Sequence, residues 1–287
     1  MPDAPTVLVT GAGRGIGRAC CLRFLEDGWR VVAGVRDVEG ARAALPADPA
    51  LRVVALDVTR SAEVAAAVAA AEAHAAGALS CLVNNAGYAV LGSSEDVDLG
   101  EARRMFETNL LGAVAVTQAA LPSMRRAGTG AVVNMSSIGA RISNPLLGLY
   151  HATKYGMTAW SESMRVELAP FGVRVHVVEP GMVETDFPAA TRVTGALARG
   201  EGPWAEFFTE MRAGFRVWRA RASSTAEEVA QAVARAAADA SAPFRIPVGA
   251  DAEEMGAARE RLGDEQFHRW LAGYVGFPAP GAGGAAD

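Results

Sequence analysis

Short apolar runs, rich in β-branched residues, alternate along the chain with longer stretches in which apolar positions recur at helical spacing. The runs are apolar at successive positions, which is typical of strands covered by helices on both faces. Regular alternation of strands and helices predicts an α/β fold, a doubly wound parallel sheet in three α/β/α layers. The strands are expected at residues 7–9, 31–32, 53–55, 82–83, 132–133 and 173–178.

The stretches between these runs predict crossover helices, because each is long enough to return the chain to the same edge of the sheet. These helices are expected at residues 15–27, 61–76, 99–126 and 150–169. A further helix is expected over residues 229–238. Thr225 and Glu228 stand before it at the spacing of a capping box, in which each side chain bonds a free backbone amide.

A chain of 287 residues, 51% of them hydrophobic, can bury the core of one large domain. We therefore expect a single domain over residues 1–277. Residues 278–287 consist of Pro, Gly and Ala with one Asp, a composition typical of a disordered tail.

The net charge of −5 argues against nucleic acid and anionic membranes as partners. No secretory signal and no apolar run of membrane-spanning length is visible, so we expect a cytoplasmic protein without a membrane segment. Cys20, Cys21 and Cys81 have no metal-ligand spacing, and neither do the four histidines. We expect reduced cysteines packed in the core and no bound metal.

A glycine-rich turn, Thr-Gly-Ala-Gly-Arg-Gly-Ile-Gly, follows the first strand and opens the first helix. Glycine permits the tight turn and the close approach of a ligand, and the helix N-terminus offers free amides to an anion. The spacing is neither a P-loop nor the common G-x-G-x-x-G, because Ile16 occupies the last position of that pattern. The turn predicts a phosphate-bearing ligand held by Gly11, Arg14, Gly15, Ile16 and Gly17.

A second motif, Asn84-Asn85-Ala86-Gly87, follows the fourth strand at the edge of the sheet where ligands bind in open α/β folds. With the Thr-Gly-x3-Gly-x-Gly turn, it resembles the short-chain dehydrogenase/reductase family over residues 6–185. The resemblance implies a Rossmann fold and an oxidoreductase that moves hydride between a nicotinamide cofactor and a carbonyl or alcohol. It also implies cofactor contacts from Asp57 and Val58 (adenine), from Asn84, Ala86 and Gly87 (ribose), and from Val183 and Thr185 (carboxamide). Pro180 and Gly181 match the family's Pro-Gly segment, which also contacts the cofactor.

The end of the second strand bears on the choice between NAD and NADP. A carboxylate there would bind a ribose diol, whereas arginine would bind a 2′-phosphate. Val35 occupies the carboxylate position, and Arg36 and Arg14 can supply charge-assisted contacts to a phosphate, which favours NADP(H). Alternatively, both arginines are solvated loop charges and Asp37 caps the next helix, and an Asp37 that turned inward would favour NAD(H) instead.

Tyr150 and Lys154 begin a predicted helix four positions apart, so the phenol and the ammonium project from the same face. A neighbouring cation stabilises phenolate and lowers the pKa of the tyrosine. Among 27 Lys and Arg residues, Lys154 is the only lysine. A compact ammonium fits beside a phenol where a planar guanidinium does not.

The family resemblance extends to two more candidate catalytic residues. Ser137 precedes Tyr150 at the family's usual separation and would hydrogen-bond the substrate oxygen. Asn109 matches the asparagine that positions a water connecting the lysine to solvent, although it could instead kink or pack its helix. Tyr150 would then exchange the proton, Ser137 would orient the oxygen, and Lys154 would lower the tyrosine pKa.

After Thr185 the family pattern fades, and six large apolar residues recur at near-helical spacing. They predict either a core-facing stripe or a lid over the nicotinamide within residues 186–224, which would give a bulky apolar substrate pocket. The layout loosely resembles the steroid and retinoid dehydrogenase branch. The six residues are Trp204, Phe207, Phe208, Met211, Phe215 and Trp218.

The family commonly forms dimers or tetramers through helices that correspond to residues 99–126 and 150–169, so a homodimer or homotetramer is expected. Two other functions stay open: an NAD-dependent alcohol or hydroxysteroid-like dehydrogenase on the same scaffold, and a nucleotide sensor without catalysis. An α/β-hydrolase is excluded, because the chain has no G-x-S-x-G nucleophile elbow.

Overall fold

A seven-stranded parallel sheet forms the centre of the computed structural model, which describes residues 4–75, 77–185, 191–222 and 224–278. The strand order is β11-β7-β6-β4-β1-β2-β3, so the chain winds outward in both directions from between β1 and β4. The predicted Rossmann-type α/β fold is confirmed. The strands are β1 Thr6–Thr10, β2 Arg30–Val35, β3 Leu51–Ala55, β4 Cys81–Asn84, β6 Gly130–Met135, β7 Val173–Pro180 and β11 Arg245–Val248.

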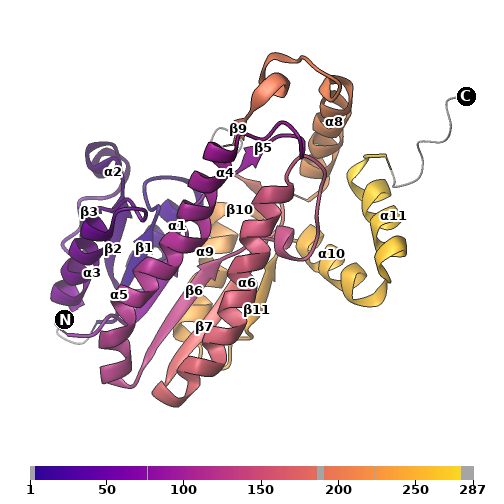
Figure 1. The fold of residues 1–287 in the computed structure, drawn as a ribbon. Helices are drawn as coiled ribbons and strands as arrows, with labels where there is room; N and C mark the ends of the chain where they lie inside the picture. Colours follow the sequence, from indigo (N-terminus) through magenta and orange to yellow (C-terminus); the bar gives the residue numbers. More distant parts are fainter. Residues whose placement is uncertain (1–3, 76, 186–190, 223, 279–287) are drawn as a thin grey trace, which may run out of the picture.

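Helices cover both faces of this sheet (Figure 1). Successive residues of β1 divide between the faces: Val7 and Val9 pack beneath α1 and α9, whereas Leu8 packs beneath α3, α5 and α6. This division explains why the centre of β1 is apolar at successive positions. The layer helices are α1 Gly15–Glu26, α2 Val38–Ala44, α3 Ser61–Ala75, α4 Leu99–Phe106, α5 Gly112–Ala127, α6 Gly148–Leu168 and α9 Ala226–Ala238.

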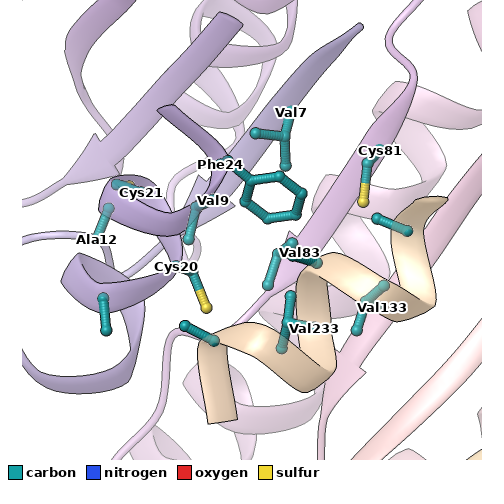
Figure 2. Packing of buried hydrophobic residues seen from close by; sticks show 14 of the residues in the cluster. Val7, Val9, Ala12, Cys20, Cys21, Phe24, Cys81, Val83, Val133 and Val233 are labelled. Carbon is teal, nitrogen blue, oxygen red and sulfur yellow. The ribbon is translucent and has the colours of Figure 1, made fainter. Parts of the chain in front are cut away.

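The core between the sheet and helices α1 and α9 contains all three cysteines (Figure 2). Cys20, Cys21 and Cys81 are free and buried, as expected for packing residues. Phe24 of α1 fills the space beside them and contacts the ring of Trp29 at a centroid distance of 4.9 Å.

The predicted helix over 99–126 is interrupted. A π-helical turn, η1 Glu107–Leu111, separates α4 from α5. Such turns insert one residue into a helix and are frequent at functional sites. Here the turn carries Asn109, which is 1% exposed.

Thr225 forms the predicted capping box, accepting from the Glu228 amide while the Glu228 carboxylate accepts from the Thr225 amide. The helix begins at Ala226, three positions before the predicted start.

A smaller group of elements lies beyond β7 and β11 and above the carboxyl edge of the sheet (Figure 1). Helices α8, α10 and α11 pack together through a cluster that includes Trp218, Met255 and Phe267. Most of the expected tail, residues 279–287, and part of the expected lid, residues 186–190 and 223, lie outside the described residues. The remaining described elements, inside and outside this group, are β5 Val90–Leu91, η2 Ile138–Ala140, η3 Ala169–Phe171, β8 Val183–Glu184, β9 Arg192–Val193, η4 Gly195–Arg199, α8 Ala205–Ala222, β10 Ser224–Thr225, α10 Ala250–Arg261 and α11 Asp264–Val275.

Among the described helices, none combines the length and apolar character required to cross a bilayer.

Candidate active site

A cleft of about 1260 Å³ runs along the carboxyl edge of the sheet, across the point between β1 and β4 where the strand order reverses. Ligands bind at this position in open α/β sheets. Of the predicted site residues, all but Asn84 and Asn109 line this cleft. They are Gly11, Arg14, Gly15, Ile16, Gly17, Arg36, Asp57, Val58, Ala86, Gly87, Ser137, Tyr150, Lys154, Pro180, Gly181, Val183 and Thr185.

Asn85 connects the glycine-rich turn to the segment after β4, a role that the sequence analysis did not assign to it. The Asn85 Nδ2 donates to the carbonyls of Thr10 at 2.9 Å and Gly11 at 3.2 Å. Gly11 has a φ of +67°, and a Cβ there would lie 2.9 Å from the Ala86 Cα, so only glycine fits. The backbone of the turn can therefore approach a ligand closely.

The first turn of α1 can bind an anion. Its N-cap residue, Arg14, makes no side-chain hydrogen bond to the free amides of that turn. Such amides, with the positive end of the helix dipole, suit a diphosphate. Among the residues that line the cleft, basic side chains outnumber acidic ones, although the whole chain is negative: Arg14, Arg36, Arg104, Lys154, Arg192 and Arg219 against Asp37, Asp57 and Glu107. The site fits a dinucleotide.

Asp37 caps α2. Its Oδ1 accepts from the Gly40 amide at 3.0 Å, and the residue also lines the cleft. The pKa of Asp57 lies below its usual value. Burial raises this pKa, but the hydrogen bonds from Thr59 and the charge of Arg36 lower it by more. An ionised Asp57 therefore lies within the electrostatic reach of Arg36.

Ser137, Tyr150 and Lys154 meet in the cleft from two neighbouring elements. Ser137 follows β6, and its Oγ accepts from the Gly139 amide at 3.0 Å. Tyr150 and Lys154 lie on α6, where the Lys154 Nζ is 5.8 Å from the centroid of the Tyr150 ring and donates to the Met135 carbonyl at 2.8 Å. The predicted i, i+4 geometry is present.

The pKa values of these groups are set mainly by burial. Burial raises the pKa of Tyr150 to about 12, against a lowering effect of its hydrogen bond with Ser137. Burial also lowers the pKa of Lys154 to about 8. At neutral pH the phenol is therefore protonated, the form that donates a proton, and most Lys154 side chains are charged. The hydrogen bond with Ser137 lowers the tyrosine pKa in this arrangement.

Two predicted asparagines lie beneath the cleft surface. Asn109 Nδ2 donates to the Tyr88 carbonyl at 2.8 Å, and its Oδ1 accepts from the Tyr88 amide at 3.0 Å. Its side chain thus fixes the segment after Gly87. The Asn84 Nδ2 donates to Thr117 and Asn134 at 2.9 and 2.8 Å, so this side chain joins β4 to α5 and β6.

The segment after β7 is supported by Asp251, which sequence analysis missed. This carboxylate is 0% exposed, and its Oδ2 accepts from the Met182 amide at 2.7 Å and from the Trp218 indole at 2.8 Å. It thereby joins the segment predicted to hold the carboxamide to α8. Asp251 lies 69 positions from Met182, so no local pattern signals the contact.

The six large apolar residues on and just before α8 are divided between the two predicted roles. Phe215 and Trp218 line the cleft. The other four residues, Trp204, Phe207, Phe208 and Met211, pack in a cluster around Leu146 and Leu197.

Comparison with known proteins shows which family has this fold and these motifs. Residues 5–195 match the family model for short chain dehydrogenases. The chain belongs to this family. The family resemblance of the sequence motifs is thereby confirmed.

This chain is 29% identical to the oxidoreductase BOA17 of Botryotinia fuckeliana over 264 residues, which cover 91% of this chain and 95% of the relative. It superposes with a TM-score of 0.72 on a short chain dehydrogenase from Burkholderia cenocepacia in complex with NADP, at 27% identity and with 97% and 100% of the two chains covered. It also superposes with a TM-score of 0.71 on the 3-ketoacyl-(acyl-carrier-protein) reductase of Brucella melitensis complexed with NADH, at 26% identity and with coverage of 86% and 97%. It is therefore an NAD(P)-dependent oxidoreductase.

His151, the neighbour of Tyr150, is a further cleft residue that sequence analysis missed. Burial lowers its pKa to about 4, although a hydrogen bond to the Gly139 carbonyl raises it. The unfolded chain, with a pKa near 6.5, thus binds the proton more tightly than the folded protein does. We expect His151 to destabilise the protein as pH falls from about 6.5 to 4, by about 2–3 kcal/mol.

Urea unfolding of the parent and His151→Phe between pH 7 and 4.5 tests this prediction. The variant loses two hydrogen bonds but cannot titrate at this position, so the stability advantage of the parent should shrink as pH falls. An advantage that stays constant over this range would contradict a depressed pKa at His151.

Proposed function

We propose that this protein is an NADP(H)-dependent ketoreductase that acts on a bulky, apolar ketone or the corresponding secondary alcohol, with Tyr150 as general acid and base. The observation that carries the proposal is the meeting of Ser137, Tyr150 and Lys154 in the cleft that the glycine-rich turn also lines. A protein that only sensed nucleotides would not need a phenol beside a buried lysine.

The bound cofactor would supply or accept the hydride. In the reduction direction, Tyr150 donates its proton to the substrate oxygen as that oxygen becomes negative, and Ser137 holds the oxygen by a hydrogen bond. The Lys154 ammonium donates one hydrogen bond to the Met135 carbonyl, and its two other N–H groups can donate to ribose hydroxyls. Its positive charge also stabilises phenolate, which forms when the proton leaves.

The apolar character of the remaining lining supports a bulky substrate. The polar groups at the reacting end are few, as in sites where hydrophobic contacts supply binding and a few hydrogen bonds fix orientation. The apolar residues that line the cleft beside Ser137 and Tyr150 in the chain, or in the segment after β7 and on α8, are Ile138, Ile142, Leu147, Met182, Phe215 and Trp218.

Absorbance of the nicotinamide, followed with small and bulky ketones and with NADPH and NADH, tests the function. We expect NADPH oxidation that is faster with bulky apolar ketones than with acetone. If the protein binds the cofactor, but no ketone causes oxidation of NADPH and no matching alcohol causes reduction of NADP, a nucleotide sensor is favoured.

The preference for NADP(H) is supported by the two arginines that line the cleft, Arg14 and Arg36, and by Val35, which stands where a carboxylate would bind the ribose diol. We expect Arg36→Ala to raise the KM for NADPH by about 10–100-fold, because a hydrogen bond to a charged group contributes about 1.5–3 kcal/mol. The KM for NADH should change by less than about twofold, since NADH lacks the 2′-phosphate.

Arg42→Ala is the matched control, because Arg42 pairs with Glu39 on the surface of α2 and does not line the cleft. Equal effects of Arg36→Ala on NADPH and NADH would remove the assignment of Arg36 to the 2′-phosphate.

A further inference from the structure

Strand β9 brings an arginine to the cleft from a part of the chain that follows the family motifs. Its two residues, Arg192 and Val193, pair in parallel with β5, which comes directly after the Asn84–Gly87 motif and its neighbour Tyr88 (Figure 1). The Arg192 amide donates to the Ala89 carbonyl at 2.9 Å, and Arg192 lines the cleft. The backbone of this arginine is therefore fixed to the segment that is expected to contact the cofactor.

The Arg192 guanidinium belongs to a group of three around one phenol. Its Cζ lies 5.2 Å from the centroid of the Tyr88 ring, and Tyr88 also lines the cleft. Burial and the charge of Glu101 raise the pKa of Tyr88, and the charges of Arg192, Arg104 and Arg36 act against this rise. All three guanidinium groups therefore lie within electrostatic reach of the Tyr88 hydroxyl, and all three residues line the cleft.

Glu101 holds two of these arginines beside each other. Its Oε1 accepts from Arg104 at 2.6 Å, and its Oε2 accepts from Arg192 at 2.8 Å. The hydrogen bond from Arg104 and then that from Arg192 keep the pKa of Glu101 below its usual value, although burial raises it. The carboxylate is thus ionised at neutral pH. Because two cations share this one anion, positive charge remains for a ligand.

The Arg192 guanidinium also keeps donors for a ligand. A guanidinium has five N–H groups in a fixed fork, and among the described residues only the Nη1 of Arg192 donates a side-chain hydrogen bond, to Glu101. The Arg192 side chain is 56% exposed, so a molecule in the cleft can reach it. The geometry of the fork matches two oxygens of a phosphate.

We propose that Arg192 binds a phosphate group of the cofactor, as a basic contact that β9 supplies in addition to Arg36. This inference rests on the proposed binding of NADP(H) in the cleft. A cofactor phosphate is favoured over an anionic substrate, because Arg192 shares its position around Tyr88 with the arginine at the end of β2. The phosphate is either the 2′-phosphate, which only NADPH carries, or the diphosphate, which NADPH and NADH share.

Fluorescence titration with NADPH and with NADH, in the absence of a ketone, tests the proposal without any turnover. We expect Arg192→Gln, which keeps an N–H donor but no charge, to raise the Kd of NADPH by about 3–10-fold, less than for a buried contact because the guanidinium is partly exposed. The Kd of NADH should rise by the same factor if the contact is to the diphosphate. It should change by less than about twofold if the contact is to the 2′-phosphate.

Two further variants separate the charge of Arg192 from its packing. Arg192→Lys keeps the charge but not the fork, so it should bind NADPH more tightly than Arg192→Gln does. Arg199→Gln is the matched control, because Arg199 lies in η4 of the same segment, pairs with Glu201 at the surface and does not line the cleft. Its Kd values should equal those of the parent.

Parental affinity of Arg192→Gln for both cofactors would overturn the proposal, as would equal weakening by Arg199→Gln. A parent protein that binds neither NADPH nor NADH would overturn it together with the proposed cofactor. If Arg192→Gln weakens NADPH binding but the parent turns over no ketone, the contact is supported and the ketoreductase assignment fails on its own.

Discussion

Replacement of Tyr150 by Phe is expected to lower kcat for ketone reduction by about 10²–10⁴-fold, the contribution typical of a positioned general acid. The change removes one hydroxyl from a half-buried side chain and leaves the glycine-rich turn, Arg36 and Lys154 in place. The affinity for NADPH, measured by fluorescence titration, should therefore stay within about threefold of the parent, since no phosphate contact is lost.

Tyr155→Phe provides the matched control for Tyr150→Phe. Tyr155 lies on the same helix, is 41% exposed and does not line the cleft, so its hydroxyl has no route to the substrate. Turnover by Tyr150→Phe at the parental rate would remove the assignment of Tyr150 as the acid, whatever the result with Tyr155→Phe.

Lys154→Met is expected to lower kcat/KM by about 10²-fold or more, because it removes the only cation whose Nζ lies beside the Tyr150 ring, within the part of the chain that the structure describes. It also removes the donors offered to the ribose, so NADPH should bind more weakly, unlike in Tyr150→Phe. The methionine side chain is unbranched and close in length, so the packing against Met135 should change little.

The dependence of kcat/KM on pH distinguishes loss of the Lys154 charge from a general disturbance of the active-site structure. The pKa of Lys154 is about 8, so the ammonium is retained below that pH and lost as pH rises through it. We expect kcat/KM of the parent for reduction to fall above about pH 8, since this parameter reports the free enzyme. The profile of Lys154→Met should lack that inflection, and persistence of the same inflection in the variant would assign it to another group.

The sheet was largely predictable because its strands are short apolar runs at nearly regular intervals. The edge strand β11 was missed, since Pro247 interrupts it. Proline is tolerated at an edge, where one side of the backbone needs no partner. The π-helical turn was missed for another reason: the pattern of residues 99–126 is helical throughout, and a single inserted residue is a matter of packing around Asn109.

The candidate site was predictable where motif residues act through local geometry, as in the glycine-rich turn and the Tyr150–Lys154 pair. It was not predictable where contacts join distant segments. Asp251 binds a backbone amide 69 positions away. Burial and the pairing of polar groups are properties of the folded chain, so sequence spacing does not reveal them.

Transfer of deuterium from 4-deuterated NADPH to a ketone tests the central claim most directly. The parent protein is incubated with each stereospecifically labelled cofactor and a bulky ketone, and the alcohol is analysed by mass spectrometry. Our account predicts one deuterium on the carbinol carbon from one of the two labelled cofactors, and almost none with Tyr150→Phe. An alcohol without deuterium from either cofactor, or no alcohol from any ketone although NADPH binds, would contradict hydride transfer as the function of this cleft.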